Sequence, residues 1–96
     1  MKEVLKNLDK AFENRIRLGI MSVLMVDEHI DFNELKTLLG VTDGNLASHL
    51  KNLEKSGYIT YKKSFLERKP NTNYTATKKG KESFMKHINA LEQLLH

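Results

Sequence analysis

The stretch Asp31–Gly57, with the sequence DFNELKTLLGVTDGNLASHLKNLEKSG, decides the fold of this chain. Asp31 and Glu34 have the spacing of a capping box, which predicts that a helix begins here. Gly40 predicts the end of that helix, because many helices finish on a residue in the left-handed conformation. The positions that this first helix is expected to bury are Leu35, Leu38 and Leu39.

A second helix is expected to follow at once. Thr42 can cap its N-terminus, and Val41 and Leu46 have the spacing of a hydrophobic staple across that end. The helix is expected over 42–55, and Gly57 stops it. Two helices joined by a tight, glycine-containing turn predict a helix-turn-helix.

The segment before this motif predicts two more helices. Helical spacing is found in the first segment, residues 1–12, at Val4, Leu5, Leu8 and Phe12. Asn14 is the expected N-cap of the next helix. The apolar face of that helix comprises Ile16, Ile20, Val23 and Leu24. Residues 27–29 form a solvated break, and Ile30 is expected in a very short strand.

The segment after the motif predicts a β-hairpin and a last helix. Residues 58–65 are rich in β-forming types, and 72–76 form a second such run. The polar stretch 66–71 contains the only proline and is expected to be a loop. Thr77 is the expected cap of the last helix, 78–96. The apolar positions of this helix are Phe84, Ile88, Leu91 and Leu95, with Met85 and Leu94 alongside.

Length and composition fit a single domain over 1–96, mainly α with a small β-hairpin (α+β class). The chain has no cysteine, which excludes disulfides and thiolate metal sites. No apolar run approaches the length of a membrane span, and no signal peptide precedes the first helix, so we expect a cytoplasmic protein.

The charge of the chain is concentrated in its middle. Residues 51–79 contain 8 basic and 2 acidic residues, whereas residues 1–50 contain 6 basic and 8 acidic ones. This distribution indicates a face that meets a polyanion, although an ordinary solvated lysine surface would give the same counts.

Three motifs resemble those of known repressors. Asn14–Leu18, NRIRL, resembles the opening helix motif of ArsR-type repressors. Residues 46–53, LASHLKNL, followed by 56–59, SGYI, look like their recognition-helix signature and the strand after it. Residues 74–80, YTATKKG, are similar to the end of the wing in ArsR- and MarR-type proteins. The resemblance spans nearly the whole chain and implies a winged helix-turn-helix transcriptional regulator.

The helix 42–55 is the expected recognition helix, entering the major groove of DNA. A helical wheel places Leu46, Leu50 and Leu53 on one stripe and a polar side opposite, where Asn and Ser can contact base edges and Lys can contact phosphate or guanine. The residues expected to contact DNA from this helix are Thr42, Gly44, Asn45, Ser48, Lys51 and Asn52. The alternative is a polar face that is merely solvated.

Two further residues of this helix have other expected roles. His49 lies at the edge of the apolar stripe, so core packing or a backbone hydrogen bond is expected rather than a DNA contact. Asp43 favours the helix dipole at the first helical position, although it could instead accept from a cytosine amino group.

The hairpin segment 62–73 is the expected wing, lying on the DNA backbone or in the minor groove. Arg68 and Lys69 at its tip are the strongest candidates, because a tip arginine can enter the minor groove or hold phosphate. Lys62 and Lys63 alternate, so only one of them is expected to face DNA, and Lys62 is the one assigned. The strand lysines could equally serve solubility and edge protection.

The terminal segments 1–12 and 78–96 are the expected dimerisation helices. Their apolar stripes suit burial against another helix, and a chain this short leaves little core for a long terminal helix to meet. The expected interface residues are Leu5, Leu8, Phe84, Ile88, Leu91 and Leu95. The alternative is that the two stripes cover one another within a monomer.

Catalysis and metal sensing are not expected. The chain shows no nucleophile–base pair, phosphate loop or paired carboxylates, so it is not expected to be an enzyme or to need a cofactor. Its histidines lack the tight ligand spacing of metal sensors, while a small-molecule effector stays open. The sequence favours specific binding of double-stranded DNA by a homodimeric regulator. The alternative is a winged-helix module that binds protein without specific DNA binding.

Overall fold

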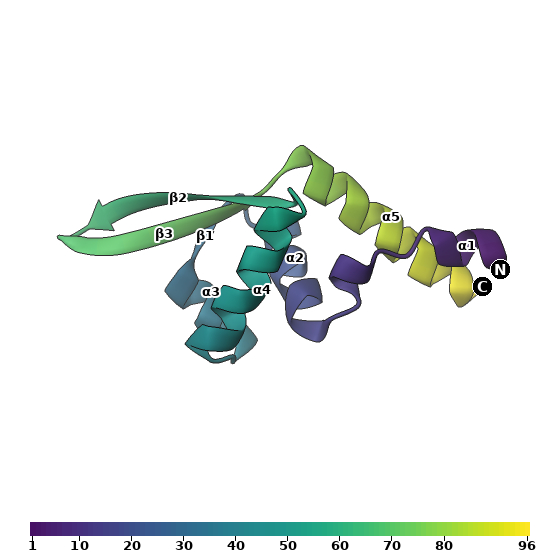
Figure 1. Cartoon of the computed structure of the whole chain (residues 1–96), viewed down its shortest axis with the longest axis horizontal. Helices are drawn as coiled ribbons and strands as arrows, with labels where there is room; N and C mark the ends of the chain where they lie inside the picture. The colour runs from purple at the N-terminus through teal and green to yellow at the C-terminus, as the bar shows by residue number, and fades with distance from the viewer.

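Five α-helices, one 3-10 helix and a three-stranded sheet make up the structure, a computed structural model that describes all residues 1–96 (Figure 1). The elements are, in chain order, α1 (Lys2–Lys6), η1 (Lys10–Phe12), α2 (Arg15–Val26), β1 (Ile30–Asp31), α3 (Phe32–Leu39), α4 (Asp43–Lys55), β2 (Ile59–Leu66), β3 (Lys69–Ala76) and α5 (Lys78–Leu94). The α+β class predicted from the sequence is confirmed.

The helix-turn-helix forms through the local signals that predicted it. Asp31 caps α3 by accepting from the backbone N–H of Glu34 at 2.8 Å, and Gly40 ends that helix with φ 63°. Thr42 caps α4 by accepting from the N–H of Asn45 at 3.2 Å. The expectation for Leu38 was wrong. It lies at the edge of the apolar face of α3 and is 63% exposed, whereas Leu35 is fully buried.

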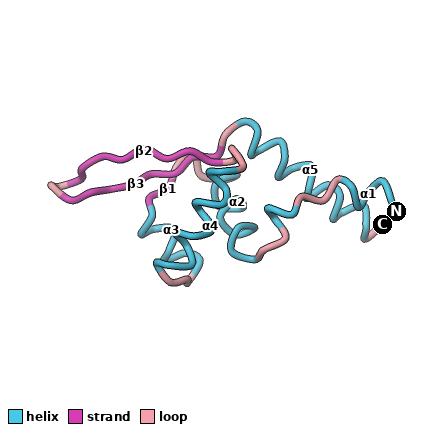
Figure 2. Tube along the Cα trace, viewed as in Figure 1, coloured by secondary structure: helices cyan, strands magenta, loops and turns pink.

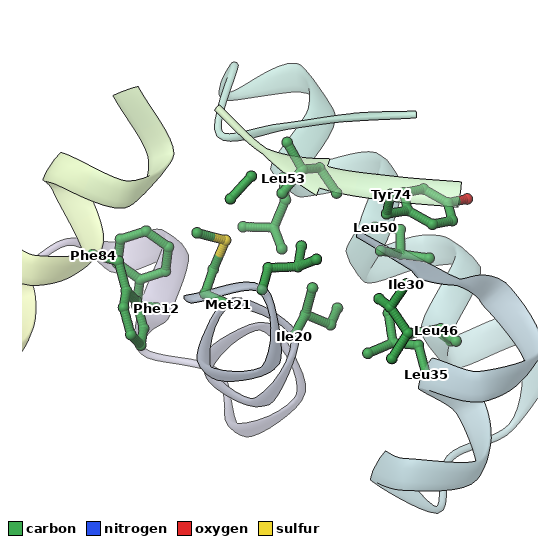
Figure 3. Packing of buried hydrophobic residues seen from close by; sticks show 13 residues of the cluster. Phe12, Ile20, Met21, Ile30, Leu35, Leu46, Leu50, Leu53, Tyr74 and Phe84 are labelled. Atoms are coloured by element: carbon green, nitrogen blue, oxygen red, sulfur yellow. The ribbon is translucent and has the colours of Figure 1, made fainter. Parts of the chain in front are cut away.

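One hydrophobic core of 13 buried residues joins the helices to the sheet (Figure 3). Its members are Phe12, Ile20, Met21, Leu24, Ile30, Leu35, Leu46, Leu50, Leu53, Ile59, Tyr74, Ala76 and Phe84. The predicted apolar stripe of α4 supplies three of them, each at most 1% exposed. Because this stripe is anchored in the core, the opposite side of α4 is turned to solvent.

The N-terminal helix is shorter than the predicted segment 1–12. It ends at Asn7, and helical structure resumes only in the short 3-10 helix η1. Asp9 explains the break. Its backbone is extended, its side chain accepts from the N–H of Ala11 at 2.9 Å, and its own N–H donates to Nδ1 of buried His87 at 2.9 Å. Phe12 then enters the core, stacked on Tyr58 with ring centroids 5.2 Å apart.

The wing is longer and its turn tighter than predicted. The stretch 66–71 is not a loop, since β2 and β3 are joined by only Glu67 and Arg68, whose φ angles are 52° and 68°. Positive φ at both turn residues matches the twist of the flanking strands. Pro70 faces Phe65 across the hairpin. In this register its missing N–H falls at a pair that exchanges no hydrogen bonds, so the strand tolerates it.

The sheet has the order β1-β3-β2, and both pairings are antiparallel. From the end of this sheet α5 runs away to the far end of the molecule, where α1 lies beside it and both termini meet (Figures 1 and 2). No helix combines the length and apolarity needed to cross a membrane. The wing and the terminal helices therefore occupy opposite ends of an elongated molecule, whose longest extent is 52 Å.

Candidate nucleic-acid interface

The recognition-helix residues predicted to contact DNA are all exposed on one side of the helix-turn-helix. They are Thr42, Gly44, Asn45, Ser48, Lys51 and Asn52. Thr42 is also the N-cap of α4, so part of its hydrogen-bonding capacity is committed within the chain. Gly44 has open space where a side chain would stand, with no atom within 4 Å. An approaching backbone could therefore come close to the first turn of α4.

Asp43 occupies the first helical position, as predicted, and is paired with a lysine that the sequence did not point to. Its Oδ1 lies 2.8 Å from Nζ of Lys36 on α3. This exposed pair spans the turn of the helix-turn-helix, and the lysine offsets the negative charge of Asp43 at the N-terminus of α4. The aspartate therefore presents less repulsion to a phosphate than its charge alone suggests.

His49 has a different partner from the one expected. Its Nδ1 lies 3.0 Å from Nη1 of Arg17, a side chain of α2, rather than near a backbone group. Burial, with a further effect of the Arg17 guanidinium, lowers the pKa of His49. The imidazole is therefore neutral at pH 7, and its Nδ1 can accept the hydrogen bond from Arg17.

A cleft of about 280 Å³ runs along the exposed side of α4. It is lined by Arg17, Ser48, His49, Lys51, Asn52 and Lys55. The structure thus brings Ser48, Lys51 and Asn52 together as predicted and adds Arg17, which the sequence reasoning missed. Arg17 lies within the NRIRL motif, but it is 32 residues away from His49 in the sequence. A contact over that distance cannot be predicted from a local sequence pattern.

The outer part of the wing, residues 60–70, is exposed throughout, and it includes Lys62, Arg68 and Lys69. Arg68 lies in the two-residue turn, which is the outermost point of the hairpin (Figure 1). Lys62 and Lys63 point to opposite faces because strand residues alternate. The Nζ of Lys63 lies 5.8 Å from the ring centroid of Tyr61, which leaves Lys62 as the strand lysine on the other face.

The residues predicted for dimerisation divide into three groups, one buried, one half-buried and one exposed. Phe84 lies in the core of a single chain, 5% exposed and edge-to-face with Phe12, so it is removed from the expected interface. Ile88 and Leu8 are half-buried. The buried side of α5 instead comprises Gly80, Phe84, His87 and Ala90. The exposed apolar residues of the terminal helices are Leu5, Met85, Leu91 and Leu95, with Met1 beside α1.

The chain is similar to DNA-binding proteins over most of its length. A family described as winged helix DNA-binding domain matches residues 16–95. An uncharacterized protein of Methanocaldococcus jannaschii is 39% identical over 85 residues, which are 88% of this chain and 92% of that protein.

Solved structures share the fold. A transcriptional regulator homologue from Pyrococcus horikoshii has a TM-score of 0.86 at 31% identity, covering 98% of this chain and 91% of that one. HlyU from Vibrio cholerae has a TM-score of 0.67 at 26% identity, covering 97% and 89%. These similarities extend over the helix-turn-helix, the wing and the terminal helices alike.

Proposed function

This chain belongs to the winged helix DNA-binding domain family, and from that premise we propose that it is a homodimeric transcriptional regulator that recognises specific sequences of double-stranded DNA. Its family is one of DNA-binding proteins and not of enzymes. The observation that carries the proposal is the polar and basic side of α4, which lines a cleft without a carboxylate and lies opposite a stripe held in the core.

Recognition helix 42–55 would enter the major groove and read base edges there. At 1.5 Å per residue, the 13 residues of α4 span about 20 Å, enough to cross a groove about 12 Å wide. Asn45, Ser48 and Asn52 carry the donors and acceptors that distinguish bases, and Lys51 carries a charge for phosphate or guanine. The wing, 62–73, would then lie along the backbone or in the minor groove.

A second copy of the chain is the partner that we propose for the terminal helices. α1 buries none of its residues in one chain, and it lies beside α5 at an end rich in exposed apolar side chains. Such a pairing would place two recognition helices on half-sites about 34 Å apart. The dimerisation helices would be those of the segments 1–12 and 78–96.

Selection from random duplex DNA tests the proposal directly. We expect sequencing of the bound fraction to reveal a two-fold symmetric motif, and affinity for that motif to fall steeply with added salt. The competing possibility, a winged-helix module that binds protein, predicts no enriched sequence. A selected pool indistinguishable from the starting library would contradict sequence-specific binding.

Replacing Asn45 or Ser48 with alanine is expected to reduce discrimination between the selected site and random duplex. Each lost base-edge contact should lower the preference by about 1–3 kcal/mol, whereas nonspecific affinity changes little. Both residues are exposed, so circular dichroism should report an unchanged fold. Ser22→Ala on α2, also exposed and outside the recognition helix, the wing and the terminal helices, is the control and should leave discrimination unaltered. The assignment fails if the variants select the same sequences as the parent with equal preference.

Removing either charge near the wing tip is expected to weaken binding to specific and unrelated duplexes alike. Arg68→Ala and Lys69→Ala should each lower the slope of log affinity against log salt by about one unit, because each loses one phosphate contact. Arg15→Ala, which removes an exposed cation of α2, is the matched control. Unchanged slopes in both wing variants would show that the wing does not touch DNA.

A further inference from the structure

Arg17 is a half-buried arginine whose side chain is held in place from two sides. Its Nε donates to the carbonyl oxygen of Ala11 at 2.6 Å, and its Nη1 meets Nδ1 of His49 at 3.0 Å. These two contacts fix the plane of the guanidinium against α4. The other N–H groups of the guanidinium have no hydrogen-bond partner in the chain, since it makes only these two side-chain contacts.

The charge of Arg17 has no counter-ion within the chain. The three ion pairs of the structure join Lys6 to Glu3, Lys36 to Asp43 and Lys78 to Glu82. Two lysines, Lys51 and Lys55, line the same cleft as Arg17, and no carboxylate lines it. Lys51 and Lys55 are exposed and solvent screens their charges, but three cations around one cleft without a carboxylate give it a positive potential that attracts an anion.

The shape of the guanidinium limits what that anion can be. With Nε and Nη1 engaged, both N–H groups of Nη2 and the second N–H of Nη1 remain free to donate to the oxygens of a phosphate or carboxylate. The cleft runs beside Ser48 and Asn52 of the recognition helix, so an anion bound there lies next to the bases that α4 would contact. On a duplex the group available at that place is a backbone phosphate.

We propose that Arg17 binds a backbone phosphate of the DNA and that His49 positions it for this contact. The inference rests on the proposed function and extends it, because the phosphate is held from α2 rather than from α4. A contact from a second helix fixes the depth at which α4 enters the groove. The neutral imidazole serves here as an acceptor and not as a DNA ligand.

Arg17→Gln is expected to weaken binding to a random-sequence duplex about tenfold and to lower the salt slope by about one unit. Arg15→Gln is the matched control, since Arg15 is exposed two residues earlier on the same helix and outside the cleft. Its effect on affinity should be much smaller. Equal affinities and slopes for the parent and Arg17→Gln would overturn the inference. A parent protein that binds no duplex at all would overturn the proposed function itself.

A second measurement works on the intact parent protein. The chain has three arginines, so its ¹⁵N spectrum holds three Nε–Hε signals, and Arg17→Lys identifies the one that belongs to Arg17. Duplex DNA should shift that signal at concentrations where inorganic phosphate does not. If saturating duplex leaves the signal in place, or inorganic phosphate shifts it and duplex does not, Arg17 is not a DNA contact.

The role of His49 is tested by rescue. His49→Ala removes the acceptor and should weaken duplex binding, whereas His49→Asn can present an oxygen near the position of Nδ1 and should restore much of it. In the Arg17→Gln background, His49→Ala should have little further effect on affinity, because His49 acts through Arg17. Additive losses in the double variant, or no rescue by asparagine, would show that His49 does not position Arg17.

Discussion

Gly80→Ala is expected to destabilise the fold by at least about 3 kcal/mol. A Cβ at this position would lie 2.1 Å from the carbonyl oxygen of Tyr58 and 2.8 Å from its carbonyl carbon. Backbone atoms cannot turn aside as a flexible side chain can. Tyr58 is also held on both sides, since its N–H donates to the oxygen of Leu53 at 3.0 Å and its carbonyl accepts from Thr77 at 2.9 Å.

The clash would separate α5 from the start of the wing. Domains of this size lose about 4–8 °C of Tm for each kcal/mol, so the midpoint of thermal unfolding should fall by more than about 12 °C. Circular dichroism during heating measures this directly. Because Gly80 has no side chain, the backbone of α5 can lie directly against the backbone of Tyr58, whose ring stacks on Phe12.

Gly44→Ala is the control for this variant. A methyl group at Gly44 meets no atom within 4 Å, and alanine favours the helix by up to about 1 kcal/mol, so stability should be equal or slightly higher. Duplex affinity should nevertheless fall, because the methyl group stands where we expect the DNA backbone to approach. A Gly80→Ala protein that melts within a few degrees of the parent would contradict the close packing described above.

Capping signals made most of the helix starts predictable from the sequence. Asn14, Asp31, Thr42 and Thr77 each accept a backbone N–H at the start of a helix, as expected. These interactions span two or three residues, so a local pattern contains all the information that they need. The apolar stripe of α4 was likewise predictable, because one helical period defines it.

Contacts between distant segments were the part that the sequence could not predict. Asp9 interrupts the N-terminal helix through partners 49 and 78 residues away, the hydroxyl of Tyr58 and Nδ1 of His87. The wing turn places Glu67 and Arg68 at positive φ, which is uncommon for either residue type, so pairing of the strands overrides the local preference. Arg17 was missed in the candidate site for the same reason.

The inner face of α5 illustrates a further limit. The spacing of Phe84, Ile88, Leu91 and Leu95 defines one apolar stripe, yet the chain buries His87 and Ala90 and leaves Leu91 and Leu95 38% and 81% exposed. A hydrogen bond to Asp9 makes the burial of His87 possible. The buried face of α5 is thus rotated away from the C-terminal half of the apolar stripe, so Leu91 and Leu95 stay exposed in a single chain.

Leu91→Glu is expected to dissociate the proposed dimer. Burying a leucine contributes about 1.5–3 kcal/mol, and a two-fold interface contains the residue twice. A carboxylate at this place would also have to be desolvated in an apolar contact. Since each 1.4 kcal/mol is tenfold, the dimer dissociation constant should rise at least about a hundredfold. Sedimentation of the parent and the variant over a range of concentrations measures the change.

Affinity for a two-fold symmetric site should fall when the dimer dissociates, because one recognition helix alone lacks the affinity gained when two linked helices bind together. Leu38→Glu is the matched control: Leu38 is also an exposed leucine, 63% accessible, but lies on α3, away from the terminal helices (Figure 1). That variant should sediment as the parent does.

Far-ultraviolet circular dichroism separates dissociation from unfolding, since some small dimers lack a stable folded monomer. A parent protein that is monomeric at micromolar concentration and binds a symmetric site without cooperativity would contradict the dimer. So would a Leu91→Glu protein that sediments as the parent does.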